Sequence, residues 1–380
     1  MLKNITIAIF GILTGILVGY LLFFRSQTKP IIKLPGVFVK QSIGFLPYWL
    51  LDKAEKDYSQ YLNEICYFGL TIGSDGKLIE FSNPQEKEPG WYALESGRVN
   101  SFLEKAKENN QTLSLTVFNG ESGSIGDLMS NPIEHADNLI SDVGPILKKY
   151  GFSDLNLDVE YVGTASEEAR MHFTEFVKEI KTRLKDENLA TLSIDVSPTI
   201  YVKNYLIDPV AISEYVDSII IMGYDYHFQG SYVTGPVAPL FGANTISEYD
   251  IQTAVEKALL ISPSSKIILG APLYGYEWET IGTTPRSPVI PGTGLIASSQ
   301  RVEELLNKCV NCSVQQDQDA LENYIVYKDP DRGSYHQIFY PNRKVMSDKI
   351  KFVQKNNLGG IALWALGYED SDILGPLKDY

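Results

Sequence analysis

The stretch YGFSDLNLDVEY at 150–161 carries the pattern from which the fold is predicted. Asn156, Asp158 and Glu160 lie two residues apart, so on a β-strand their side chains share one face. The apolar residues between them take the other face, which would meet outer helices. Burying carboxylates without partners costs several kcal/mol, so a purely structural strand would avoid this pattern. We expect these side chains to point into a cavity, and a hydrogen-bonded strand end without catalysis is the alternative.

Outward from this stretch, short apolar runs alternate with amphipathic helical patterns. The expected strands are 42–45, 64–70, 112–118, 153–159, 191–196, 218–223, 266–273 and 360–365. The expected helices include 99–109, 133–150, 166–184, 247–261 and 345–356. Apolar runs without alternation fit parallel strands that are buried on both faces. Eight such units predict an α/β fold, a closed (β/α)₈ TIM barrel, with a doubly wound open sheet as the alternative.

One region interrupts this alternation. Between about 275 and 340, the sequence predicts a helix at 298–308 flanked by strand-like runs at 323–328 and 336–339. This is a small α+β insertion between strands seven and eight. Material inserted at the carboxyl end of a barrel strand usually walls the active site.

The carboxylates of the decisive strand suit acid catalysis. Two carboxylates held close together raise each other's pKa, because like charges disfavour ionisation. Beside Asp158, Glu160 would therefore keep its proton near neutral pH and could act as a general acid.

Four motifs then appear in one order along the chain. They are SDLNLDVE at 153–160, MGYDY at 222–226, GAPLYG at 270–275 and GGIALWALG at 359–367. The first resembles the D-G-x-D-x-D-x-E signature of glycoside hydrolase family 18, the chitinase-like family. The others resemble the motifs of its strands six, seven and eight. Together they cover nearly all of the chain after the N-terminal segment.

The resemblance implies a retaining, substrate-assisted mechanism. It implies that Glu160 protonates the glycosidic oxygen and that Asp158 orients the substrate's acetamide group. It also implies that Tyr224 donates a hydrogen bond to the acetamide oxygen, with Asp225 nearby. Trp364 would form the apolar floor beneath the bound sugar.

This sequence departs from the family pattern around the catalytic strand. The first Asp of the acidic pair is Asn156, and the positions that resemble its supports read Phe45, without a hydroxyl, and Thr116, with one. Because one negative charge near Asp158 is gone, we expect its pKa to be less elevated. Activity should survive, since Asp158 and Glu160 remain.

The resemblance also implies Met222, in the strand-six motif, as a substrate contact. Further contacts are weaker predictions, because packing explains these residues at least equally well: Tyr48, Trp49, Tyr274 and Trp278. No metal or organic cofactor is implied, and the histidines are not spaced as ligands. The lone C-x-x-C, Cys309 and Cys312, predicts a local loop disulfide or two idle thiols. The net charge of −14 argues against nucleic acid and anionic lipid surfaces as partners.

The N-terminus predicts a membrane anchor at 1–25 and a tether at 26–40, ahead of the barrel at 41–380. Residues 5–24 form an uncharged, largely apolar run long enough to span a bilayer. A cleaved signal peptide is the alternative. Counting basic residues around the span places the barrel in the cytoplasm, whereas the predicted chemistry places it outside.

The leading functional hypothesis is hydrolysis of a β-1,4-linked polymer that contains N-acetylglucosamine (GlcNAc), either chitin-type or peptidoglycan glycan. The alternative is an inactive chitinase-like glycan-binding protein on the same scaffold. Such relatives typically lose the acid, and Glu160 is present.

Overall fold

The computed structural model describes residues 40–309 and 312–380 of the 380-residue chain. Residues 40–380 form one compact unit. The predicted membrane anchor, and the predicted tether apart from residue 40, lie outside the described residues. Within the described ranges, no helix is both long enough and apolar enough to cross a bilayer.

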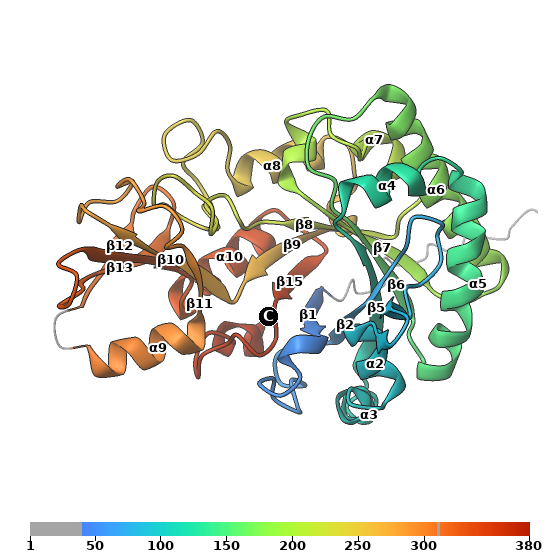
Figure 1. Cartoon of the computed structure of the whole chain (residues 1–380), viewed down its shortest axis with the longest axis horizontal. Coiled ribbons are helices and arrows are strands. Elements are labelled where there is room, and N and C mark those ends of the chain that lie inside the picture. The colour runs from blue at the N-terminus through green and yellow to red at the C-terminus, as the bar shows by residue number, and fades with distance from the viewer. Residues whose placement is uncertain (1–39, 310–311) are drawn as a thin grey trace, which may run out of the picture. The chain divides into compact units, whose positions relative to one another are not determined.

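Eight parallel strands close into a barrel (Figure 1). They are β1 (Gln41–Pro47), β2 (Glu64–Thr71), β5 (Thr112–Asn119), β6 (Asp154–Val159), β7 (Thr191–Val196), β8 (Ser218–Met222), β9 (Ile267–Pro272) and β15 (Gly360–Trp364). Their order around the barrel is β1-β15-β9-β8-β7-β6-β5-β2. Each strand overlaps one expected from the sequence. The predicted TIM barrel is therefore confirmed, and the open-sheet alternative is wrong.

Helices lie outside the strands. They are α2 (Pro89–Glu95), α3 (Asn100–Glu108), α4 (Ser122–Leu128), α5 (Pro132–Tyr150), α6 (Glu167–Asp186), α7 (Pro209–Ile212), α8 (Ile251–Leu259) and α10 (Arg343–Lys355). Short 3₁₀ turns η1 (Tyr48–Leu50), η2 (Pro198–Tyr201), η3 (Ser264–Lys266) and η4 (Gly375–Asp379), and a hairpin of β3 (Phe81–Asn83) and β4 (Glu86–Lys87), complete this part. The decisive strand follows directly from α5. Gly151, with a φ of 72°, ends that helix in the left-handed region that glycine adopts without strain.

The predicted two-faced character of β6 is present in the barrel. Leu155, Leu157 and Val159 pack outward in the main apolar core, together with residues of α5 and α6. Asn156 and Asp158 face the barrel interior, where 0% and 4% of their surface is exposed. The interior also holds a separate apolar cluster made of Ile43, Phe45, Cys66, Phe68, Ile220, Ile268 and Ala362. The polar face of β6 therefore shares the barrel interior with an apolar wall.

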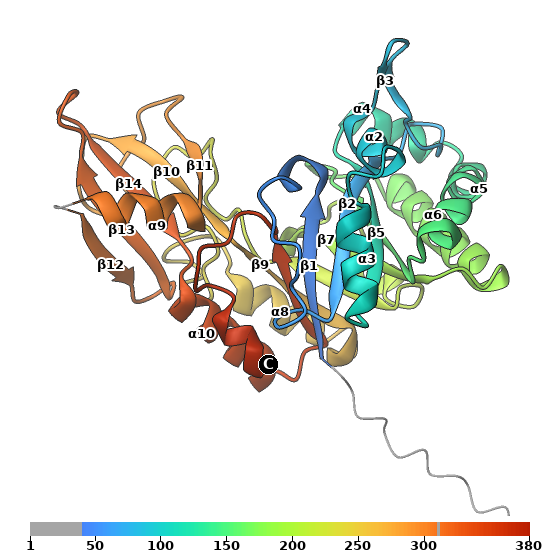
Figure 2. The ribbon, with the colours of Figure 1, turned by 90° about the horizontal axis from the view of Figure 1, so that it is seen from below.

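Between β9 and α10, the described residues form a five-stranded antiparallel sheet and one helix (Figure 2). The elements are β10 (Tyr274–Thr280), β11 (Leu295–Ser298), α9 (Ser299–Lys308), β12 (Ser313–Asp317), β13 (Glu322–Lys328) and β14 (Tyr335–Tyr340). Trp278, a weak sugar-contact prediction, is fully buried in the core of this sheet.

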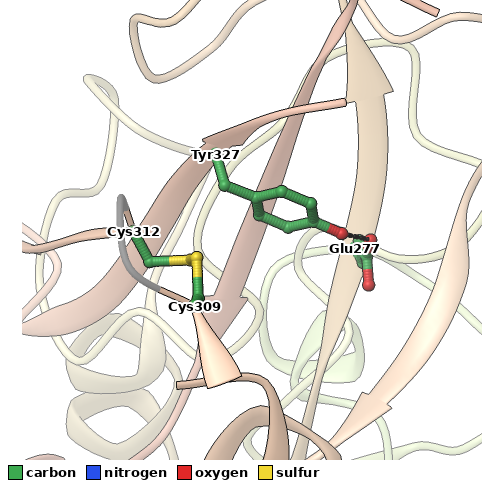
Figure 3. The surroundings of a disulfide bond; sticks show 4 residues. All are labelled: Glu277, Cys309, Cys312 and Tyr327. Atoms are coloured by element: carbon green, nitrogen blue, oxygen red, sulfur yellow. Dashed lines mark hydrogen bonds between the residues drawn. A yellow bond between two sulfur atoms is a disulfide. The ribbon is translucent and has the colours of Figure 1, made fainter. Parts of the chain in front are cut away.

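A disulfide joins Cys309 and Cys312 just after α9 (Figure 3), so of the two predicted alternatives the structure has the local disulfide. Nearby, the buried Glu277 accepts hydrogen bonds from Tyr327 at 2.5 Å and from Arg301 at 2.6 Å. Its carboxylate therefore has partners on β13 and on α9, which ties the helix to the sheet.

Candidate active site

The carboxyl ends of the barrel strands surround a cavity of about 370 Å³. Asp158, Glu160, Tyr224, Asp225 and Trp364 all line this cavity, although they come from three different strand ends. The structure thus brings together the residues to which the family resemblance assigns the central roles.

Glu160 is the first residue after β6, and its side chain opens to solvent in the cavity mouth. Its backbone N–H still donates to the carbonyl oxygen of Asn119 on β5, at 2.9 Å. The strand ladder therefore continues through Glu160 and holds its backbone. Desolvation by the cavity walls, and then the charge of Asp225, raise the pKa of Glu160. A carboxyl group that keeps its proton at higher pH is suited to act as a general acid.

Aromatic rings form the opposite wall. Trp364 makes an edge contact with Phe68, with ring centroids 4.8 Å apart, and with Trp49 at 6.1 Å. Tyr48 packs edge-on against Trp49 at 4.9 Å. Of the weaker predictions, Tyr48 and Trp49 do line the cavity, whereas the roles of Phe68 and Phe118 in this wall were not predicted. A wall of this kind suits the C–H face of a sugar.

Tyr274, a weaker sugar-contact prediction, contacts Asp225. Its hydroxyl donates a hydrogen bond to Oδ1 of Asp225 at 2.5 Å, and it is not among the residues that line the cavity. Tyr276 donates to the same oxygen at 3.2 Å. Tyr274 and Tyr276 therefore both fix the carboxylate of Asp225, and a sugar contact of Tyr274 stays a prediction.

Asp225 itself has a φ of 60°, the left-handed region that few residues other than glycine adopt. This conformation directs its carboxylate toward the two tyrosines and toward the cavity. Burial raises the pKa of Asp225, while the hydrogen bonds from Tyr274 and Tyr276 act in the opposite direction. Strained backbone of this kind is often found at functional sites.

Asn156 lies below the cavity with each end of its amide hydrogen-bonded. Its Oδ1 accepts from Thr116 at 2.9 Å, so the hydroxyl that the sequence retains at 116 is used. Its Nδ2 donates to Oγ of Ser193 at 3.1 Å and to Oδ1 of Asp195 at 3.0 Å. Phe45, which has no hydroxyl, packs in the apolar cluster and touches Trp364.

The prediction that Asn156 leaves the pKa of Asp158 less elevated than an Asp at 156 would do stays a prediction, but Asp158 does have charged neighbours. Burial, and then the charges of Asp195 and Glu160, raise the pKa of Asp158 well above its usual range. Asp195 comes from β7, the neighbouring strand, and its carboxylate lines the same cavity. The sequence did contain a signal for it. In Thr191–Val196, Ser193 and Asp195 are polar residues two apart in an otherwise apolar strand.

A second cavity, of about 680 Å³, adjoins the first on the other side of Glu160. Both cavities share Glu160, Asp195, Met222, Tyr224 and Asp225 as lining residues. Met222 thus lies between them. Tyrosines contribute much of the second lining: Tyr161, Tyr205, Tyr226, Tyr249 and Tyr276. The cleft therefore extends to both sides of the candidate acid.

Among the residues that the structure describes, no group of three or more His, Cys, Asp or Glu side chains is arranged to hold a metal ion. The described lining of the two cavities also contains no Lys, Arg or His. The charged groups of the site are therefore carboxylates alone.

Comparison with known proteins identifies the family of this chain. A sequence profile of glycosyl hydrolases family 18 matches residues 41–369. The cortical fragment-lytic enzyme of Bacillus subtilis is 26% identical over 330 residues, which cover 83% of this chain and 67% of that protein. The structure of a Group IV chitinase from Ostrinia furnacalis has a TM-score of 0.75 at 22% identity, covering 90% of this chain and 97% of that one.

The spore cortex-lytic enzyme SleL of Bacillus cereus has a TM-score of 0.70 at 21% identity, covering 90% of this chain and 74% of that one. At such identities, the two solved structures support the barrel fold. The family profile spans the whole barrel, from β1 to beyond β15. This protein therefore belongs to glycosyl hydrolases family 18 and is a glycosidase.

Proposed function

We propose that this protein hydrolyses β-1,4-linked GlcNAc-containing polysaccharide with retention of the anomeric configuration. The observation that carries the proposal is the shared cavity, in which Asp158 and Glu160 face Trp364 and Tyr224. The relatives that match this chain are a cortical fragment-lytic enzyme and chitinases, whose names point to glycans of this class.

In the proposed reaction, Glu160 gives its proton to the glycosidic oxygen and the bond to the leaving sugar breaks. The substrate's own acetamide oxygen attacks the anomeric carbon and forms an oxazolinium ion. Glu160 then takes a proton from water, which attacks the same carbon and reopens the ring. The starting state of Glu160 is restored at the end.

The other residues act on the acetamide group and on the sugar. Asp158 accepts the acetamide N–H and balances the positive charge that develops on the ring. Tyr224 donates its hydroxyl to the acetamide oxygen, and the ring of Trp364 lies beneath the sugar. The raised pKa of Glu160 supports its role as the acid, since the group needs its proton at the start.

A polymer fits the cleft better than a single sugar does. The two adjoining cavities of about 370 and 680 Å³ meet at Glu160, which leaves room for sugars on both sides of the cleaved bond. Chitin and peptidoglycan glycan both have the required linkage, and both lie outside the cytoplasm. The disulfide between Cys309 and Cys312 supports an extracytoplasmic barrel, because such bonds persist in oxidising compartments.

The test uses the fragment from Gln41 onward, supplied with chitooligosaccharides and with purified peptidoglycan. Products are identified by mass and their anomeric form by NMR immediately after cleavage. We expect β-anomeric products, and we expect Glu160→Gln to lower kcat by about 10²- to 10⁴-fold while the fold is kept. Early α-anomeric products would contradict the substrate-assisted mechanism.

Oligosaccharide binding separates this proposal from the glycan-binding alternative. If the wild-type fragment binds GlcNAc oligomers but cleaves neither substrate, and Glu160→Gln binds them equally well, the chain is a glycan-binding protein. Tyr232, which is 92% exposed and lies outside both described cavities, provides a matched surface control as Tyr232→Ala.

A further inference from the structure

Asp195 is a second buried carboxylate beside Asp158. The two residues are directly paired in register across β6 and β7, whose strands run parallel. Side chains of paired residues on neighbouring strands lie on the same face of the sheet. Each has 4% of its surface exposed, and both line the cavity below Glu160. The two carboxylates therefore lie at the same level of the barrel, on neighbouring strands.

The hydrogen bonds around the pair are unequal. Oδ1 of Asp195 is held by the amide of Asn156 at 3.0 Å. Oδ1 of Asp158 is buried, and within the described part of the chain it has no hydrogen-bond partner. Buried polar atoms are rarely left this way, so the exception requires an explanation. Asn156 cannot exchange a proton at this position, so any shared proton must lie on Asp158 or Asp195.

When two neighbouring carboxyl groups are buried together, the charge of each disfavours ionisation of the other. Burial raises the pKa of Asp195 to about 8, with the hydrogen bond from Asn156 opposing the shift. The titratable groups around the pair are Asp154 and Glu160 from the β6 segment, Cys66 on β2, and Tyr224 and Asp225 after β8. These neighbours are all acidic, so the pair holds at least one proton near neutral pH.

We propose that Asp195 is a positioning residue that shares one proton with Asp158 during the reaction. The inference rests on the proposed function and deepens it. In the reactive form of the unliganded enzyme the pair carries one proton, which lies on Asp158, while Asp195 is ionised and accepts the hydrogen bond from Asn156. As positive charge grows on the substrate's acetamide, the O–H bond of Asp158 breaks and an O–H bond forms on Asp195. The proton returns when water opens the oxazolinium ring, so the net charge of the pair never changes.

This arrangement makes the charge of Asp158 appear only when the substrate needs it. An interaction that is stronger in the transition state than in the ground state raises kcat, whereas an equal one only strengthens binding. Without Asp195, Asp158 would be ionised before the substrate reacts. Its charge would then stabilise the bound substrate as well as the transition state, which lowers the gain in kcat. Loss of Asp195 should therefore act on kcat and leave KM nearly unchanged.

The test compares Asp195→Asn with the double variant Asn156→Asp/Asp195→Asn, which returns one carboxylate to the neighbouring position. We expect kcat of the single variant to fall by about tenfold to a hundredfold, with KM within about threefold. In the double variant we expect kcat to recover to within about tenfold of wild type. A structural role alone would give no such recovery.

The second readout is the titration of Asp158 without substrate, followed by NMR of protein labelled with ¹³C at Asp carboxyl carbons. Removing the charge of Asp195 should lower the pKa of Asp158, and the double variant should raise it again. The matched control is Asp127→Asn, the same substitution at an exposed position of α4. It should leave the pH profile of kcat unchanged, because Asp127 lines neither described cavity.

The outcomes separate the two proposals. If the wild type cleaves no GlcNAc oligomer, the proposed function fails, while the titration still tests whether the carboxylates share a proton. An unchanged pKa of Asp158 in Asp195→Asn overturns the inference even in an active enzyme. If Asp195→Asn does not fold, the double variant Asn156→Asp/Asp195→Asn is measured instead. The inference is rejected if the pKa of Asp158 in the double variant lies in its usual range, or if kcat of the double variant is more than about a hundredfold below that of the wild type.

Discussion

The barrel interior has two walls that differ in kind. One is apolar and is formed by β1, β2, β8, β9 and β15. Its residues are Ile43, Phe45, Cys66, Phe68, Ile220, Ile268 and Ala362. The other is polar and comes from β5, β6 and β7, with Ser114, Thr116, Asp154, Asn156, Asp158, Ser193 and Asp195. The apolar wall packs like an ordinary core, whereas Asp158 and Asp195, the cavity-lining carboxylates that lie within barrel strands, both belong to the polar wall.

Within the polar wall, depth decides how well a carboxylate is satisfied. Asp154, in the deep layer, accepts hydroxyl donors from Ser193 at 2.6 Å and from Thr191 at 2.6 Å. Asp158, one layer nearer the mouth, leaves Oδ1 without a partner among the described residues. Burial alone therefore does not distinguish the two carboxylates, whereas the missing hydrogen-bond partner of Asp158 among the described residues does.

Placing a charge on the apolar wall should have the largest effect. Ile268→Asp puts a carboxylate on a fully buried position among apolar neighbours, with no hydroxyl donor of the kind that Asp154 has. We expect no stably folded protein, because such burial costs several kcal/mol. The matched control Ile268→Ala, which only leaves a cavity, should lower the free energy of unfolding by about 2–5 kcal/mol in urea denaturation. Equal stability of the two variants would show that the walls are not distinct.

Removing the unsatisfied carboxylate should affect rate and not folding. In Asp158→Ala we expect kcat on a chromogenic GlcNAc oligomer to fall by about 10²- to 10³-fold. The melting temperature should stay the same or rise, because a buried carboxylate with like-charged neighbours is lost. A marked fall in melting temperature would mean that Asp158 has a structural role.

The pH dependence of stability should reflect the whole polar wall. Burial raises the pKa of Asp154 to about 6 and of Asp195 to about 8, against about 4 for an unfolded Asp. The folded state therefore holds these protons more tightly. Their contribution to the free energy of unfolding is complete below about pH 4. As the pH rises, the contribution of Asp154 is lost by about pH 6 and that of Asp195 by about pH 8. Thermal unfolding at constant ionic strength should show stability falling over this window, by up to about 1.4 kcal/mol per pH unit for each proton.

The variant Asp195→Asn checks the sign of that slope. Its stability should fall less steeply with pH than that of the wild type, since one group with a raised pKa is gone. A steeper fall would contradict the assignment of the raised pKa to Asp195.

The smallest expected effect concerns Asn156. In Asn156→Asp a third carboxylate replaces the amide that donates to Asp195, so the site must bind a further proton or accept more repulsion. We expect the pH profile of kcat to shift by about one unit while KM changes little. The shift is measured as kcat against pH over the stability range of both proteins. An unchanged profile would mean that position 156 is electrostatically isolated from the cavity.

The features that depend on a single strand could be predicted from the sequence. The period-two pattern at 155–160 predicted which face of β6 is polar, because alternation is a property of a single strand. The eight strands were found for a similar reason, since each is a short apolar run with its own boundaries. The family motifs gathered Glu160, Asp158, Tyr224 and Trp364 before any geometry was known.

The rest depended on register between strands. Nothing local in Thr191–Val196 says that Asp195 lies opposite Asp158, because that pairing is set when β6 and β7 align. The hydrogen bond from Tyr274 to Asp225 could not be predicted for a related reason, because Asp225 is distant in sequence and held in a left-handed conformation. The cysteine pair could not be assigned either, because spacing alone does not distinguish a disulfide from free thiols.

The amide of Glu160 is anchored to Asn119 although the residue lies just past its strand. The loop that starts at Tyr161 can therefore vary in length and sequence without moving the acid. Related enzymes could diversify which glycan they accept by exchanging that loop, with the proton donor inherited unchanged. The proton donor and the segment beside it can therefore change independently of each other.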